Sequence, residues 1–109
     1  MRIWLIGADE GAIRAIEQLC KNPEITLVVS AAIDKPKAVT AGLIERVDYV
    51  ERVSHVNVND LARRIRPDLI LIDPAALARD YARIAAGMAF SEELTREIAA
   101  VSHYPCLVL

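Results

Sequence analysis

The stretch that decides the fold spans residues 2–19 and reads R-I-W-L-I-G-A-D-E-G-A-I-R-A-I-E-Q-L. It begins with an aliphatic run around Trp4, which is typical of a strand that is buried on both faces. A turn with two glycines follows. Beyond it, apolar residues recur at helical spacing, and Ile13, Ile16, Leu19 and Cys20 share one face. The stretch therefore predicts a buried strand, a tight turn and an amphipathic helix, the first unit of a parallel α/β sheet.

The rest of the chain repeats this alternation between strand and helix. Further strands are predicted at residues 25–30, 47–50, 69–72 and 105–109. Helices are predicted from Pro36 to Leu43, from Asn57 or Asn59 to residue 65, over residues 77–88, and from Ser91 to Val101. Their inward-facing residues are Leu61, Ala62 and Ile65, then Leu77, Tyr81, Ile84 and Met88, and finally Leu94, Ile98 and Val101. We expect one Rossmann-like domain over residues 1–109, an α/β fold with a doubly wound, five-stranded parallel sheet of order 3-2-1-4-5.

Composition narrows the class of protein. The chain has 109 residues, of which 54% are hydrophobic and only 5% aromatic, and its net charge is -2 without a block of like charge. We therefore expect a packed domain and neither a nucleic-acid nor a membrane partner. Cys20 and Cys106 match no metal or redox spacing and are interpreted as core thiols. With no signal peptide and no long apolar run, the expected location is the cytoplasm.

The fold also predicts where a ligand would bind. In doubly wound sheets ligands lie beyond the carboxyl ends of the strands, near the point where the strand order reverses. Here that point lies between the first and fourth strands. The residues predicted to line it are Gly7, Ala8, Asp9, Glu10, Gly11, Ser30, Asp34 and Asp73.

The turn after the first strand allows two interpretations. Gly7, Asp9 and Ala12 can be aligned with the dinucleotide fingerprint G-x-G-x-x-G/A, which would make the turn a pyrophosphate site for NAD(P) or another nucleotide. However, the middle position carries an aspartate, whose charge would repel a phosphate. Asp9 also suits the start of a helix, where an acidic side chain caps the backbone.

The remaining candidates also have two interpretations each. Ser30, with Lys35 and Lys37, could accommodate a 2′-phosphate, but residues such as Asp34 and its neighbours are more commonly part of a solvated turn. Asp73 could project into the crevice, and with Asp9, Glu10 and Asp34 it could form a site for a hard cation. Alternatively, Asp73 caps the helix that begins after Pro74.

Three family resemblances involve these residues. Residues 7–19 and 25–36, the latter I-T-L-V-V-S-A-A-I-D-K-P, resemble the start of methionyl-tRNA formyltransferase-type enzymes, and R-P-D-L-I-L-I-D at 66–73 is similar to a later strand there. This resemblance covers about the first 75 residues and implies a folate-binding half. The strand, turn and helix at 2–19, together with R-P-D-L-I-L-I-D, resemble the N-terminal domain that precedes an ATP-grasp module, as in glycinamide ribonucleotide synthetase. R-P-D-L-I-L-I-D also resembles the phosphoacceptor strand of response-regulator receivers, which implies that Asp73 accepts phosphate and that Asp9 and Glu10 form an acidic pocket.

At superfamily level the chain resembles small Rossmann-like domains of the NAD(P)-binding type. We expect a non-catalytic regulatory domain that binds a nucleotide or small metabolite. Two alternatives stay open: the N-terminal, formyltransferase-like part of an enzyme whose catalytic segment lies elsewhere, and a degenerate interaction or receiver-like domain. The aliphatic last strand suits a homodimer or a following domain packed against that edge.

Overall fold

The structure of the chain, a computed structural model, describes residues 1–80 and 87–109. Its strands are β1 (Arg2–Ile6), β2 (Thr26–Ala31), β3 (Tyr49–Val50), β4 (Leu69–Ile72) and β5 (Cys106–Val108). Its helices are α1 (Glu10–Leu19), α2 (Lys37–Thr40), α3 (Val58–Ile65), α4 (Pro74–Asp80) and α5 (Gly87–Val101).

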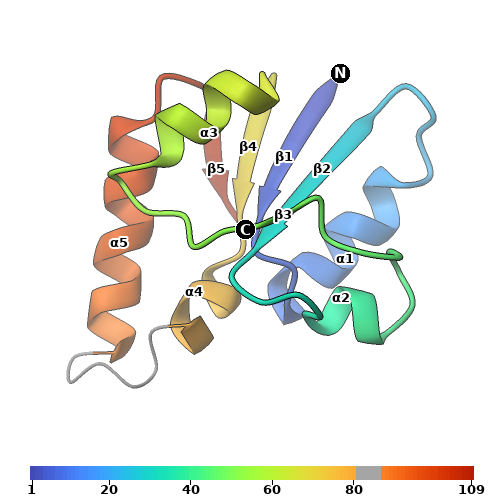
Figure 1. Cartoon of the computed structure of the whole chain (residues 1–109), viewed down its shortest axis with the longest axis horizontal. Helices are drawn as coiled ribbons and strands as arrows, with labels where there is room; N and C mark the ends of the chain where they lie inside the picture. The colour runs from blue at the N-terminus through green and yellow to red at the C-terminus, as the bar shows by residue number, and fades with distance from the viewer. Residues whose placement is uncertain (81–86) are drawn as a thin grey trace.

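The five strands form one parallel sheet in the order β3-β2-β1-β4-β5, as the sequence predicts (Figure 1). β1 is central and pairs with β2 on one side and with β4 on the other. The strand order reverses between β1 and β4, so the carboxyl ends of these two strands mark the predicted site. Receiver domains have the strand order 2-1-3-4-5, and the observed order therefore differs from theirs.

Helices cover both faces of the sheet, and each face has its own apolar core. α1 and α2 lie on one side and α3 and α5 on the other (Figure 1). Trp4 and Ile6 of β1 point into the α3–α5 core, whereas Ile3 and Leu5 point into the α1–α2 core. This alternation explains why β1 is apolar at every position after Arg2. Trp4 is fully buried, as expected, and its indole N–H donates to the Ser30 hydroxyl at 2.9 Å.

Several sequence predictions need correction. Ser91 does not cap a helix, because α5 begins at Gly87 and contains Ser91. Cys20 is exposed at the end of α1 rather than buried, and Val101 is also exposed. Of the predicted stripe over residues 77–88, Leu77 lies buried on α4, Met88 belongs to α5, and Tyr81 and Ile84 lie outside the described residues.

In the described part of the chain, no helix combines the length and the apolar character needed to cross a membrane.

Candidate functional site

Asp73 is the centre of the predicted site, and its side chain is fully buried. It follows β4 directly, and its carboxylate reaches across to the turn between β1 and α1. One oxygen, Oδ2, accepts hydrogen bonds from the backbone N–H groups of Asp9 at 3.0 Å and Ala12 at 3.1 Å. The other oxygen, Oδ1, accepts from the N–H of Ala75 at 3.0 Å. Asp73 therefore caps α4, as one of the two interpretations predicts, and also binds the first turn of α1.

These contacts decide what the start of α1 can do. The first N–H groups of a helix have no partner within the helix and form the site at which Rossmann-like domains bind phosphate. In this chain, the Asp73 carboxylate occupies that position at the N–H groups of Asp9 and Ala12. A phosphate at the same N–H groups would have to displace a buried carboxylate of like charge.

Gly7 and Gly11 are explained by the same arrangement. Gly7 has a φ of +89°, and a Cβ atom there would lie 2.6 Å from the Cβ of Ala76. A Cβ on Gly11 would lie 2.3 Å from Oδ1 of Asp73. Both glycines therefore let the turn after β4 approach the turn after β1. In the dinucleotide fingerprint, glycines at such positions are explained by the close approach of a ligand.

Burial raises the pKa of the Asp73 carboxyl above its ordinary value. The backbone N–H groups of Asp9, Ala75, Ala76 and Ala12 act in the opposite direction, because they stabilise the charged form. Burial is the larger effect. The receiver resemblance requires an accessible acceptor at this position, whereas the carboxylate of Asp73 is enclosed.

Asp9 occupies the N-cap position of α1, but its side chain makes no capping hydrogen bond. Asp9 therefore lies at the start of the helix, as predicted, but the predicted capping hydrogen bond is wrong, because Asp73 supplies the acceptor. The Asp9 carboxylate pairs with the guanidinium of Arg79 on α4 at 2.9 Å, and Arg79 also contacts Asp80 at 3.4 Å. Burial raises the pKa of Asp80, against the lowering effect of the Arg79 charge. The pair between Asp9 and Arg79 joins α4 to the turn after β1.

The other predicted site residues lie apart from Asp73. Ala8 is buried, and its carbonyl accepts a hydrogen bond from the N–H of Ala38 at 3.0 Å. Glu10 is exposed and pairs with Lys37, which lowers the pKa of Glu10. Ser30 is buried under the turn, where its carbonyl accepts from the N–H of Gly7 at 2.7 Å. Asp34 lies exposed on the loop after β2.

A cation site is not supported by this geometry. Within residues 1–80 and 87–109, no three His, Cys, Asp or Glu side chains are grouped so that they could hold a metal ion. The two oxygens of Asp73 already accept backbone hydrogen bonds. The alternative in which Asp9, Glu10, Asp34 and Asp73 bind a hard cation is therefore wrong.

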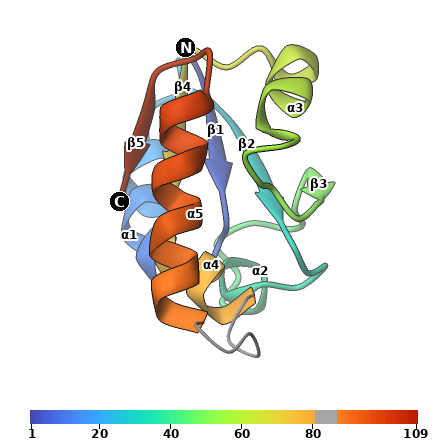
Figure 2. The same cartoon turned by 90° about the vertical axis from the view of Figure 1, so that its left-hand side faces the viewer.

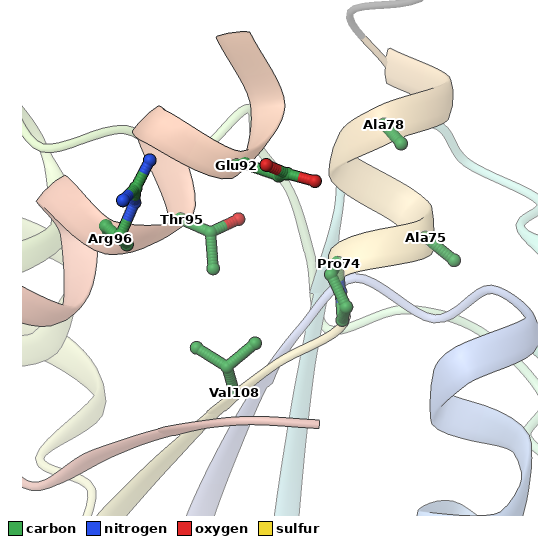
Figure 3. A pocket seen from close by; sticks show the side chains of 7 residues that line it. All are labelled: Pro74, Ala75, Ala78, Glu92, Thr95, Arg96 and Val108. Carbon is green, nitrogen blue, oxygen red and sulfur yellow. The ribbon is translucent and has the colours of Figure 1, made fainter. Parts of the chain in front are cut away.

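An open pocket lies farther along the same edge of the sheet, between α4, α5 and β5 (Figure 3). Its volume is about 560 Å³. The side chain of Glu92 extends from α5 toward α4, and Thr95 and Arg96 lie on the next turn of α5. We call it the α4–α5 pocket; its lining residues are Pro74, Ala75, Ala78, Glu92, Thr95, Arg96 and Val108.

The polar side of this pocket is absent from the residues predicted by sequence. Glu92 follows Ser91, where the sequence predicts only the start of a helix. Thr95 and Arg96 belong to no motif, and Val108 is one residue of an aliphatic run. No residue pattern could have located the pocket, because it depends on how α4, α5 and β5 are placed around it.

No protein-family model, no curated protein and no solved structure matches the chain. The resemblances to formyltransferases, to ATP-grasp enzymes and to receivers therefore stay predictions.

Proposed function

We propose that the chain is a non-catalytic domain that binds a small metabolite in the α4–α5 pocket. The observation that carries this proposal is a contrast along one edge of the sheet. The backbone donors of the turn after β1 already bind Asp73, whereas a pocket of about 560 Å³ lies open beyond β4 and β5. Ligand pockets in proteins measure roughly 300–1,000 Å³ and favour the carboxyl edge of α/β sheets.

The lining indicates the chemical class of the ligand. Pro74, Ala75, Ala78 and Val108 offer an apolar wall. Arg96 can bind an anionic group, and Glu92 can accept a hydrogen bond from an amine or a hydroxyl. A small molecule with an apolar body and one or two charged groups fits this combination. The nucleotides predicted from sequence, NAD(P) first among them, are candidates for the same pocket.

The turn after β1 has a structural role in this proposal. It receives the Asp73 carboxylate, and the ion pair between Asp9 and Arg79 holds α4 in place. Since α4 forms one wall of the α4–α5 pocket, these contacts position the wall. The cytoplasm, where the free thiols of Cys20 and Cys106 would stay reduced, is the proposed compartment.

A thermal-shift and calorimetric screen tests the proposal. The compounds are NAD, NADP, ATP, ADP, S-adenosylmethionine, amino acids and small carboxylates. A ligand at 100-fold excess over its Kd should stabilise the folded protein by about 2.7 kcal/mol.

The matched variants are Glu92→Trp and Val101→Trp, which place the same side chain toward opposite ends of α5. Glu92 lines the α4–α5 pocket, whereas Val101 is exposed and outside the lining. We expect Glu92→Trp to abolish the ligand-induced shift and Val101→Trp to retain it. The proposal fails if no compound stabilises the protein, or if Glu92→Trp binds as tightly as the unaltered chain.

A further inference from the structure

β5 is an edge strand whose residues are aliphatic and exposed. The strand order places it at the end of the sheet, beside β4 (Figure 2). In the part of the chain that the structure describes, no element covers its free edge. Leu107 is 58% exposed, Val108 47% and Leu109 43%. Parallel sheets are normally covered, so three exposed aliphatic residues in a row need an explanation.

The opposite edge of the sheet shows what a protected edge looks like. β3 has only two residues, and the charged residues Asp48 and Glu51 flank it directly. Flanking charge is a device that prevents pairing with another chain, and it distinguishes β3 from β5, which is also short, with three residues. Residues 104–108, in contrast, carry no charged side chain. The edge at β5 therefore has the composition of a strand that pairs.

The hydrogen bonds to β4 determine which groups of β5 face outward. The N–H of Ile70 donates to the carbonyl of Pro105 at 2.8 Å, and the N–H of Leu109 donates to the carbonyl of Ile72 at 2.9 Å. In a parallel ladder, alternate residues direct their backbone groups to the same neighbour. Positions 105, 107 and 109 thus face β4, and the N–H and C=O groups of Cys106 and Val108 face away from the sheet.

We propose that a second copy of this chain covers the edge, with the two β5 strands antiparallel around a two-fold axis at Leu107. Cys106 of one copy then lies opposite Val108 of the other. Each of these two pairs exchanges both of its N–H···O bonds, so all the outward-facing groups of both strands are satisfied. The two sheets become one.

Self-complementarity is the reason for choosing a second copy over an unrelated partner. A two-fold arrangement brings each surface against itself, so it excludes surfaces on which like charges would meet. Here Leu107 meets Leu107, with no charge on the strand. α5, of 15 residues and therefore about 22 Å long, runs beside β5 in each copy and extends the contact beyond the strand (Figure 2).

Light scattering coupled to gel filtration, applied to the full chain, tests this proposal. We expect a mass of twice 12.0 kDa for the unaltered protein. Leu107→Lys and Leu107→Asp should each give monomers, because two like charges would face each other across the axis. Mixing the two variants should restore a one-to-one dimer. Val56→Lys, at a 77% exposed position between β3 and α3, is the control and should leave the dimer intact.

Each other outcome overturns the proposal. A monomeric unaltered protein means that the edge does not pair with itself, and a dimeric Leu107→Lys variant means that the interface lies elsewhere. Failure of the mixed variants to associate rules out the two-fold register. Far-UV circular dichroism shows whether the variants are folded, and little change is expected because Leu107 is already exposed.

Cross-linking tests the register independently. With Cys20 and Cys106 replaced by serine, Leu107→Cys should form a disulfide between copies, because facing residues of a non-hydrogen-bonded pair lie about 4.5 Å apart between Cα atoms. Leu109→Cys is the matched control and should not cross-link, since in this register it faces position 105 of the other copy. Cross-linking of Leu109→Cys without Leu107→Cys contradicts the register.

Discussion

The two halves of the carboxyl edge use polar side chains in opposite ways. Over β1 and β4, the Asp73 carboxylate is buried and binds backbone N–H groups from two helices. Beyond β4 and β5, Glu92 and Arg96 are exposed beside an open pocket. In the first region, backbone N–H groups that bind a ligand in many doubly wound folds bind a side chain of the protein instead. The comparison teaches that a site of familiar topology can be filled by the protein itself.

Gly7→Ala should have the largest effect on the first region, with a loss of about 3–4 kcal/mol in the free energy of unfolding. The new Cβ would meet Ala76 at 2.6 Å, and the φ of +89° adds strain. Gly42→Ala is the matched control. It has a φ of +79° and no heavy atom within 4 Å of the new Cβ, so it should cost only about 1–2 kcal/mol. Equal losses in urea unfolding would show that the turns after β1 and β4 are not tightly packed.

Asp73→Asn should lower the free energy of unfolding by about 2–3 kcal/mol. In the unaltered protein both carboxylate oxygens accept backbone N–H groups, whereas the asparagine would place its N–H₂ group against one of these donors. Urea unfolding measures the loss. The matched control is Asp34→Asn, on an exposed loop, which should change stability by less than about 0.5 kcal/mol. A loss at Asp73 no larger than that at Asp34 would contradict the structural role of this carboxylate.

The comparison of the unaltered protein with Asp73→Asn also separates the pH dependence of Asp73 from that of other groups. The ordinary pKa of its carboxyl is 3.8, and burial raises that value in the folded protein. Between pH 3.8 and the raised pKa, the folded state keeps a proton that the unfolded state has lost. The contribution of Asp73 to the free energy of unfolding is therefore fully present below about pH 3.8 and is lost as pH rises through the raised pKa. When unfolding is measured from about pH 3 to about pH 7, the unaltered protein should be more stable than Asp73→Asn by an amount that decreases with pH. An advantage that increases with pH would reverse the sign.

The ion pair between Asp9 and Arg79 should make the smallest of these contributions to the free energy of unfolding. The Asp9 side chain is 13% exposed and that of Arg79 is 39% exposed, so water screens the pair only in part. We expect a coupling of about 0.5–1 kcal/mol in a double-mutant cycle of Asp9→Asn and Arg79→Gln. A coupling near zero would mean that packing alone holds α4 against the turn after β1.

The fold could be predicted from sequence because each strand is a distinct aliphatic run and each crossover must be right-handed. The alternation around Trp4 determines two buried faces, and the order 3-2-1-4-5 follows from the helices between the runs. Helix boundaries were less predictable. Ser91 has the chemistry of an N-cap, but α5 begins four residues earlier, at Gly87.

The site was predictable only in part. The sequence places Asp73 at the end of a strand near Asp9, and the structure brings those two residues together. Which donor the carboxylate would bind could not be read from the chain, because the contact joins residues 64 positions apart. The same spacing of glycines serves a bound phosphate or an internal carboxylate. The α4–α5 pocket depends on how two helices diverge, and no residue pattern records that divergence.

Two-dimensional amide NMR spectra, recorded with and without a compound that stabilises the protein, test the central claim most directly. We predict that the amides of Ala75, Ala78, Thr95, Arg96 and Val108 shift on binding. The amides of Asp9 and Ala12 should keep their positions, because they stay bonded to Asp73. Shifts centred on residues 7–12, with the α4–α5 pocket unaffected, would place the ligand on the turn after β1 and contradict the claim.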